Sequence, residues 1–339
     1  MRADAVLTEA ATVARRANDR RIELRAGIES AAAHLLDESS SSVHQLLDLA
    51  EESVPIFESL GDDRSLGRAW LLTAWVQGGV MGRWAESRQS AERALEHYRR
   101  AGMPSSTCIS QIAAAAYYGP MPVGDAIGHL KHLLEHDVDD LAGEASVLAH
   151  TGGLESMRGN FDEAADLLGR ARAMYEELGR PTAIARTCAP LEAEAARLRG
   201  DLEHAGRVLR ESCTALRETR NWNHFGSQAA ALADVLHELG ETKEALEWVD
   251  AAATKALGDD AAAQIAWRTV RAKIDRDPGL ARDAVERAET TDLLNVRAAA
   301  LLALGDEVST AEARRLYELK GNVAAAALAT AATPPAGAT

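Results

Sequence analysis

The feature that most constrains the fold is a triplet of small and apolar residues that recurs along the chain. In one copy, Leu168 and Ala171 follow Ala164 at positions +4 and +7. This spacing places the three side chains on one face of an α-helix. Successive copies begin about 36 to 41 residues apart, and such regularity is typical of repeat proteins. The other copies begin at Leu46, Ser87, Ala126, Ala205, Ala245 and Ala281.

A second helical stretch lies between successive triplets, so the repeated unit consists of two helices. These intervening stretches end at a glycine or a short polar turn, which suits a left-handed C-cap. Small residues at +0 and +7 allow the triplet helix to approach the helix before it. Tyr98 and Tyr175 fall at +11, where a large ring would close the end of a pair. One pair cannot bury both of its faces, so we expect each pair to lean on the next.

The composition supports helices throughout. Alanine is abundant, aromatic residues make up only 4% of the chain, and the alternation of β-branched and aromatic residues that marks strands is missing. The length of 339 residues exceeds one ordinary core but fits a long repetitive domain. We therefore expect an all-α solenoid, followed by a small, proline-containing disordered tail at 331–339.

Some of these segments carry a family resemblance. The segment Gly-Asn-Phe-Asp-Glu-Ala at 159–164 resembles the start of the second helix of a tetratricopeptide repeat, and related segments lie around Trp84, Leu202 and Thr242. The period is nearer 40 residues than the family's roughly 34, and the Trp and Pro positions of the family are mostly unfilled. The resemblance implies a right-handed superhelix of about eight antiparallel helix pairs, forming a single domain over 1–330.

The long repeat unit also resembles the C-terminal helical region of large actinobacterial regulators. These regulators carry a STAND-type ATPase and a nucleotide-cyclase or LuxR-type DNA-binding module, and the segments 60–70, 262–273 and 314–326 carry the resemblance. Residues 3–19 have the character of a second helix, but no first helix precedes them. We therefore expect the domain to begin with an unpaired helix, within a longer polypeptide that supplies an upstream ATPase or cyclase module as a partner.

The sequence carries no catalytic signature that would make the chain an enzyme. The motifs GxxxxGK[ST], HExxH, GxSxG and CxxC are missing, so we expect no cofactor and no metal. His129, His132 and His136 share one helical face at i, i+3 and i+7. A zinc site usually takes a ligand from a second element, so we expect these histidines to lie on a solvated surface.

The net charge and the cysteines indicate which classes of partner and which cellular compartment suit the chain. A formal net charge of −15 disfavours binding to nucleic acid or to anionic membranes. The three cysteines are widely spaced and fit buried thiols in a reducing cytosol better than a disulfide framework. No stretch approaches the roughly 20 apolar residues of a membrane span. We therefore expect a cytoplasmic protein.

The tetratricopeptide resemblance implies that the first helices of the pairs line a concave groove. Ser146, Ala149 and Gly153 fall on its inner wall, where their small side chains would leave room for a peptide or another helix. Counting back from the triplets also places four polar residues on this wall: Glu194, Arg197, Asp234 and His237.

A second group of candidates, Trp267, Arg268 and Arg271, shares one helical neighbourhood. These residues could offer a partner a cation–π platform or a carboxylate clamp. The alternative is a structural role, in which the arginines form salt bridges with an acidic residue of the next helix. For Trp222 and Phe225 the two alternatives are packing at a helix interface and contact with a ligand.

These observations predict a non-catalytic module that binds a protein or peptide segment in the groove. Within the resembled regulators it would act as the sensor or regulatory arm of a signalling or transcriptional protein. The alternative is a small-molecule sensor in which the solenoid closes around a ligand near Trp222, His237 and Trp267.

Overall fold

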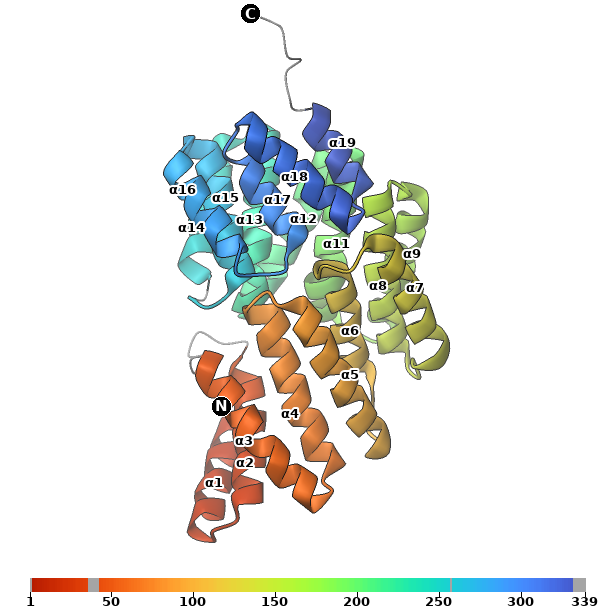
Figure 1. Ribbon diagram of the computed structural model, residues 1–339, viewed down its shortest axis with the longest axis vertical. Coiled ribbons are helices and arrows are strands. Elements are labelled where there is room, and N and C mark those ends of the chain that lie inside the picture. Colours follow the sequence, from red (N-terminus) through yellow and green to blue (C-terminus); the bar gives the residue numbers. More distant parts are fainter. Residues whose placement is uncertain (1, 36–42, 257, 332–339) are drawn as a thin grey trace, which may run out of the picture.

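The chain folds into paired helices that follow one another along a solenoid (Figure 1). The computed structural model describes residues 2–35, 43–256 and 258–331, and no strand occurs within these ranges. The predicted all-α solenoid is therefore confirmed. The tail expected at 331–339 lies outside the described residues except for Ala331, which ends the last helix. No described helix is long and apolar enough to cross a membrane.

The described pairs follow the order that the triplets predict. A π-helical segment η1 (Val76–Val80) extends α4, while α10 (Pro181–Ala183) and π-helical η2 (Ile184–Cys188) lead into α11. Helix α1 (Arg2–Arg16) precedes the first pair and packs against α2, and α19 (Val323–Ala331) follows the last pair. The pairs are α2 (Arg20–His34) with α3 (Val43–Leu60), α4 (Asp63–Trp75) with α5 (Trp84–Arg100), α6 (Ser106–Tyr118) with α7 (Val123–His136), α8 (Leu141–Arg158) with α9 (Phe161–Glu177), α11 (Ala189–Arg199) with α12 (Leu202–Glu218), α13 (Trp222–Glu238) with α14 (Thr242–Lys255), α15 (Ala261–Asp275) with α16 (Pro278–Ala288), and α17 (Leu294–Leu302) with α18 (Glu307–Lys320).

The recurring triplets form the buried face of the second helix in the first seven of these pairs, from α3 to α16. Ala164 and Ala171 of α9 are fully buried, and Leu168 between them is almost fully buried. Because the alanine methyl groups are small, α9 can lie close against α8. The first residues of the other copies are buried as well: Leu46, Ser87, Ala126, Ala205, Ala245 and Ala281.

A tyrosine ring closes the end of the α4–α5 pair, as its position at +11 predicts. The Tyr98 ring lies against Gly67, where an added Cβ atom would come within 2.3 Å of ring carbon Cδ1. The Arg68 guanidinium donates a hydrogen bond to the Tyr98 hydroxyl at 3.4 Å and another to Glu29 of α2 at 2.6 Å. The ring and the guanidinium therefore join two successive pairs.

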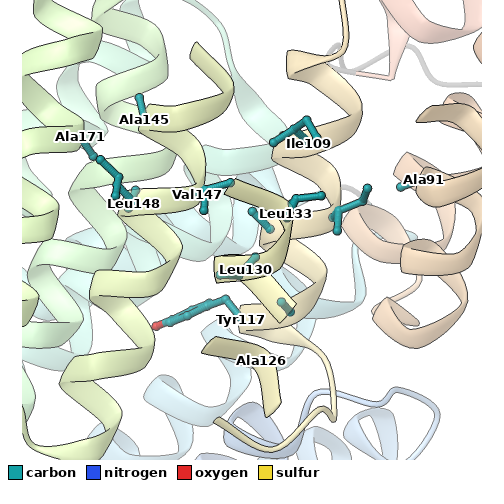
Figure 2. Packing of buried hydrophobic residues seen from close by; sticks show 14 of the residues in the cluster. Ala91, Ile109, Tyr117, Ala126, Leu130, Leu133, Ala145, Val147, Leu148 and Ala171 are labelled. Carbon is teal, nitrogen blue, oxygen red and sulfur yellow. The ribbon is translucent and has the colours of Figure 1, made fainter. Parts of the chain in front are cut away.

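The largest apolar core surrounds the middle of the solenoid and extends from α4 to α11. Figure 2 shows Leu130 and Leu133 of α7 and Val147 of α8 as members of this one cluster. In the same view the Tyr117 ring extends from the end of α6 toward α8. Gly153 of α8 makes room for that ring, because a Cβ atom there would lie 2.7 Å from its Cε2.

The solenoid is not an open rod, because its last pairs return to its early ones. Asp292, between α16 and α17, accepts hydrogen bonds from the Trp84 and Ala85 amides at the start of α5. Lys320, at the end of α18, donates to backbone carbonyls between α6 and α7. Figure 1 shows the blue helices α18 and α19 near α11, and α19 packs against α8 and α11. The sequence predicted that each pair leans on the next, and these pairs also contact units far away in the chain.

The close approach of α4 and α5 can be tested by replacing Gly67 with alanine. The new methyl group would overlap the Tyr98 ring, so we expect Gly67→Ala to lower the free energy of unfolding by about 1–3 kcal/mol. The control is Gly169→Ala in α9, where a Cβ atom meets nothing within 4 Å and helix propensity should add about 0.5–1 kcal/mol. Urea denaturation measures both variants, and a Gly67→Ala protein as stable as the control would contradict the packing.

Candidate functional site

Five charged side chains gather on the first helices of three successive pairs, and we call them the inner charged cluster. They are Glu194 and Arg197 in α11, Asp234 and Glu238 in α13, and Lys273 in α15. Within α11 and α13 the two members are three or four residues apart, so they point to the same side of their helix.

Hydrogen bonds and ion pairs connect the members of the inner charged cluster. The Arg197 Nε and Nη2 atoms donate to the two carboxylate oxygens of Glu194 at 2.9 and 2.8 Å. The Lys273 Nζ atom donates to both carboxylate oxygens of Asp234, each at 2.8 Å. Glu238 is held less closely, since its carboxylate lies 3.9 Å from Arg197 Nη1. The cluster therefore contains three carboxylates and two cations, with one carboxylate weakly paired.

The inner charged cluster is partly withdrawn from water, and its pKa values reflect that. The Asp234 side chain is 19% exposed and the Glu238 side chain 36%. The Glu194 carboxylate outweighs desolvation and raises the pKa of Arg197. Desolvation favours a higher pKa for Asp234, but the charge and hydrogen bonds of Lys273, with Arg197, hold it below the ordinary value. Desolvation and the neighbouring Asp234 charge raise the pKa of Glu238.

Three tyrosines from distant parts of the chain lie near the inner charged cluster. Tyr117 and Tyr118 end α6, and Tyr317 belongs to the last turn of α18. Burial raises the pKa of all three hydroxyls, that of Tyr118 to about 12, and the Glu194 charge acts on each of them. Because such electrostatic effects are short-ranged in salt water, these tyrosines lie near the inner charged cluster. We use the name chamber for this set of neighbouring side chains, which belong to α6, α11, α13, α15 and α18.

A histidine of α8 packs against two of these tyrosine rings. The His150 ring lies 6.1 Å from the Tyr117 ring and 6.5 Å from the Tyr118 ring, edge to face in both cases. Burial lowers the pKa of His150 to about 4, so this ring is neutral at physiological pH. The two tyrosine rings are themselves in edge contact, with centroids 4.7 Å apart. These three rings are therefore uncharged at neutral pH.

The four polar residues predicted by counting back from the triplets lie together at the chamber. Glu194, Arg197 and Asp234 belong to the inner charged cluster, and the His237 charge acts on Asp234 from one turn away. The His237 Nδ1 atom is buried and has no hydrogen-bond partner among the described residues. A binding role for these residues stays a prediction.

Trp267, Arg268 and Arg271 lie elsewhere, at the contacts of α15 with α14 and α16. Arg268 stacks on the Trp267 ring at 4.1 Å and donates to Asp283 of α16 at 2.5 Å. Arg271 donates to Asp250 of α14 at 2.7 Å. These contacts match the structural alternative, in which the arginines form salt bridges with neighbouring helices, and a partner contact by these three residues stays a prediction.

The small residues expected to leave room for a peptide are instead buried in helix packing. Ser146 and Ala149 are completely buried, and the space beside Gly153 is filled by Tyr117 and by Leu191, whose Cδ2 lies 3.1 Å from the position of a Cβ atom. The prediction that they line an open wall is therefore wrong. Small residues on α8 admit the protein's own side chains.

Several chamber residues escaped the sequence-based prediction. Glu238 lies one turn after Asp234 and could have been found by continuing the same helical face. Lys273 occupies the matching position on the next first helix, one repeat later. Tyr117 and Tyr317 could not be connected, because their proximity depends on the return of α18 to α6.

Other features of the described chain give no sign of catalysis or metal binding. No group of three or more His, Cys, Asp or Glu residues in the described ranges could hold a metal ion. The His132 and His136 rings stack on each other at the surface helix α7, with centroids 4.3 Å apart. Burial raises the pKa of the Cys108, Cys188 and Cys213 thiols to about 12, so they are poor nucleophiles at neutral pH.

The ion pair between Asp234 and Lys273 predicts a pH-dependent stability. The pKa of Asp234 is lowered in the folded chain, so its carboxylate stabilises the fold at pH values above the ordinary 3.8, and this stabilisation is lost as the pH falls through the lowered value. We expect Asp234→Asn to cost about 1–3 kcal/mol near neutral pH and less at acid pH. Urea unfolding at several pH values measures the difference. A cost that does not shrink in acid would contradict the pairing.

Comparisons with known proteins place the fold. No protein-family model and no curated protein sequence matches the chain. Among solved structures, a Rap protein complexed with Competence and Sporulation Factor is similar, with a TM-score of 0.66 and 12% sequence identity. The match covers 93% of this chain and 85% of that chain. At this identity the likeness concerns the fold alone, and it shows a helical-repeat architecture like that of the Rap protein.

Proposed function

We propose that this chain is a non-catalytic regulatory module that binds a protein or peptide segment in the chamber. The inner charged cluster is the observation that carries the proposal. It brings three carboxylates and two cations together, close to His237 and to tyrosines on which the Glu194 charge acts. A peptide offers matching chemistry, because its amides and side chains can pair with polar groups while its apolar groups contact rings.

These side chains are better suited to binding a ligand than to catalysing a reaction. Asp234 and Glu194 are each paired with a cation, at 2.8 Å in both cases, so neither is poised to move a proton. His150 is neutral, with Nδ1 hydrogen-bonded to the Ser146 carbonyl at 2.7 Å. Fixed charges of this kind orient a ligand and reject segments of the wrong charge.

The fold likeness supports the proposal in a second way. The Rap protein whose fold is similar was solved in complex with Competence and Sporulation Factor. A solenoid of this architecture can therefore hold a partner. The likeness extends over 93% of this chain, so it includes most of the solenoid.

We also propose what kind of protein contains this module. The resemblance of 60–70, 262–273 and 314–326 to bacterial regulators supports a role as the sensor arm of a cytoplasmic signalling or transcriptional protein. An ATPase or cyclase module of such a protein would be the component that responds to the bound segment.

Selection from a library of displayed random peptides tests the proposed function on the purified chain. Enriched peptides are synthesised, and their dissociation constants are measured by titration calorimetry. We expect Asp234→Asn to weaken binding at least about tenfold, because it removes the charge of one chamber pair.

The control is Asp283→Asn, which also breaks an ion pair to α15 but lies away from the chamber, at the contact of α15 with α16. We expect it to bind the selected peptides like the wild type. Equal losses in the two variants, or no enrichment at all, would overturn the proposal. Thermal stabilisation by small molecules without peptide enrichment would instead favour the alternative of a small-molecule sensor.

A further inference from the structure

Arg186 is an exposed arginine on the helical stretch that leads into the inner charged cluster. It lies in η2, directly before α11. Among the described residues it has no hydrogen-bond or ion-pair partner, and no carboxylate is among the groups that act on its pKa. Arg197 and Lys273, by contrast, are each paired with a carboxylate. The Arg186 guanidinium therefore keeps its five donors for an acceptor from outside the described chain.

The backbone that carries Arg186 is well anchored. The carbonyl of Ala185 accepts hydrogen bonds from Ser212 Oγ of α12 at 2.8 Å and from Gln228 Nε2 of α13 at 3.0 Å. Cys188, at the end of η2, is completely buried in the largest apolar core. The segment is π-helical, and π-helical turns within longer helices are frequent at functional sites. The exposed guanidinium thus extends from a turn that is fixed on two sides.

Arg186 shares a helix side with the inner charged cluster. Helices α10, η2 and α11 follow one another without a break, and Arg197 comes eleven residues after Arg186, which is close to three full turns. The rise along the helix separates the two positions by about 16 Å. The Arg186 charge also acts on His224, in the first turn of α13, and Glu238 lies close to four turns further along that helix. Arg186 is therefore near the opposite end of the helices that carry the cluster.

The surroundings of Arg186 leave its charge poorly compensated. Protein atoms around the guanidinium displace part of its hydrating water, and this desolvation lowers the pKa of Arg186, while the Tyr175 hydroxyl acts in the opposite direction. Burial and the Arg186 charge lower the pKa of His224 to about 3, so this ring is neutral at physiological pH. An arginine remains protonated in such surroundings. A carboxylate that approached would supply both the missing charge and acceptors for two hydrogen bonds.

Uncharged side chains separate Arg186 from the inner charged cluster. Along α13, Ser227 and Ala231 fall on the same side of the helix between His224 and Glu238, and Ala231 is exposed. A ligand that contacts both ends must therefore carry its acidic group about 16 Å from the part that contacts the cluster. A peptide segment can present charges at such a separation, whereas a small compact ligand cannot.

We propose that Arg186 binds a carboxylate of the segment held at the inner charged cluster, through two parallel hydrogen bonds from its guanidinium. The identity of the ligand as a segment rests on the proposed function, whereas carboxylate binding at Arg186 does not. The planar guanidinium matches a carboxylate in shape and charge. The carboxylate belongs either to an acidic side chain or to the C-terminus of the segment, and the peptides described below distinguish the two.

Titration of the purified chain with sodium acetate, at constant ionic strength, tests the carboxylate site without a peptide. Nuclear magnetic resonance of the arginine Nε–H groups follows each guanidinium, and the Arg186 signal is identified by its loss in Arg186→Gln. The reference is Arg282 of α16, which is also exposed and has no partner among the described residues. We expect Arg186 to reach half-saturation at an acetate concentration at least about fivefold lower than Arg282. Equal responses of the two arginines would overturn the site.

Urea denaturation of Arg186→Gln separates a binding role from a structural one. The variant removes a poorly compensated charge and breaks no hydrogen bond or ion pair of the described chain. We therefore expect its unfolding midpoint to equal or exceed that of the wild type, as is common when a binding residue is replaced. Arg282→Gln is the matched control and should unfold like the wild type. A midpoint that falls only in Arg186→Gln would show that Arg186 supports the fold and would contradict the proposal.

Peptides enriched on the wild type identify the carboxylate. Each is synthesised unchanged, with Asp and Glu replaced by Asn and Gln, and with an amidated C-terminus. We expect one of the two changed forms to bind the wild type at least about tenfold more weakly than the unchanged peptide, because it lacks the charge that Arg186 pairs with. For Arg186→Gln the same change should cost less than about threefold.

The outcomes for the site and for the proposed function are separate. A full loss in Arg186→Gln, or no loss with either changed peptide, would overturn the site and leave peptide binding intact. Preferential acetate binding at Arg186 without any peptide enrichment would count against the proposed function alone.

Discussion

Close approach between paired helices is the constraint on which the structure depends. With only 4% aromatic residues, the chain cannot fill wide gaps between helices with large rings. It instead brings backbones together through small side chains such as Ala164 and Ala171, and it places a ring such as that of Tyr98 where a glycine leaves space. Each pair then covers the exposed side of its neighbour, and the solenoid follows from repetition of this contact.

The same geometry explains why the interior is charged. A first helix packs against its own partner and against its neighbours, which leaves one side facing the centre. Side chains on that side have limited access to water, so charges there are stable only in pairs, as between Arg197 and Glu194 or Lys273 and Asp234. Under the proposed function, a bound segment would interact with groups that already have partners. Such contacts discriminate between ligands more than they maximise affinity.

The sequence correctly predicted features that depend on local periodicity, such as helix faces. It did not predict contacts between distant pairs, which depend on how all the intervening pairs are stacked. The triplet at Ala164 defines a helix face, and counting back from such triplets correctly grouped Glu194, Arg197 and Asp234. The prediction for Gly153 was wrong, because the tyrosine that fills its space comes from another pair. The contact of Lys320 with the end of α6 depends on the rotations between all the pairs that separate them, and no local sequence pattern predicts it.

The contact of Asp292 with the start of α5 also bears on how such a chain can evolve. Open solenoids change length easily, since a duplicated or deleted unit alters only the number of stacked pairs. Here two distant units must meet within hydrogen-bonding distance, so gaining or losing one pair between them would displace the carboxylate from its amides. The contact between the last pairs and α5 therefore limits evolutionary change to substitutions and to the gain or loss of pairs outside the connected segment, such as α2 with α3.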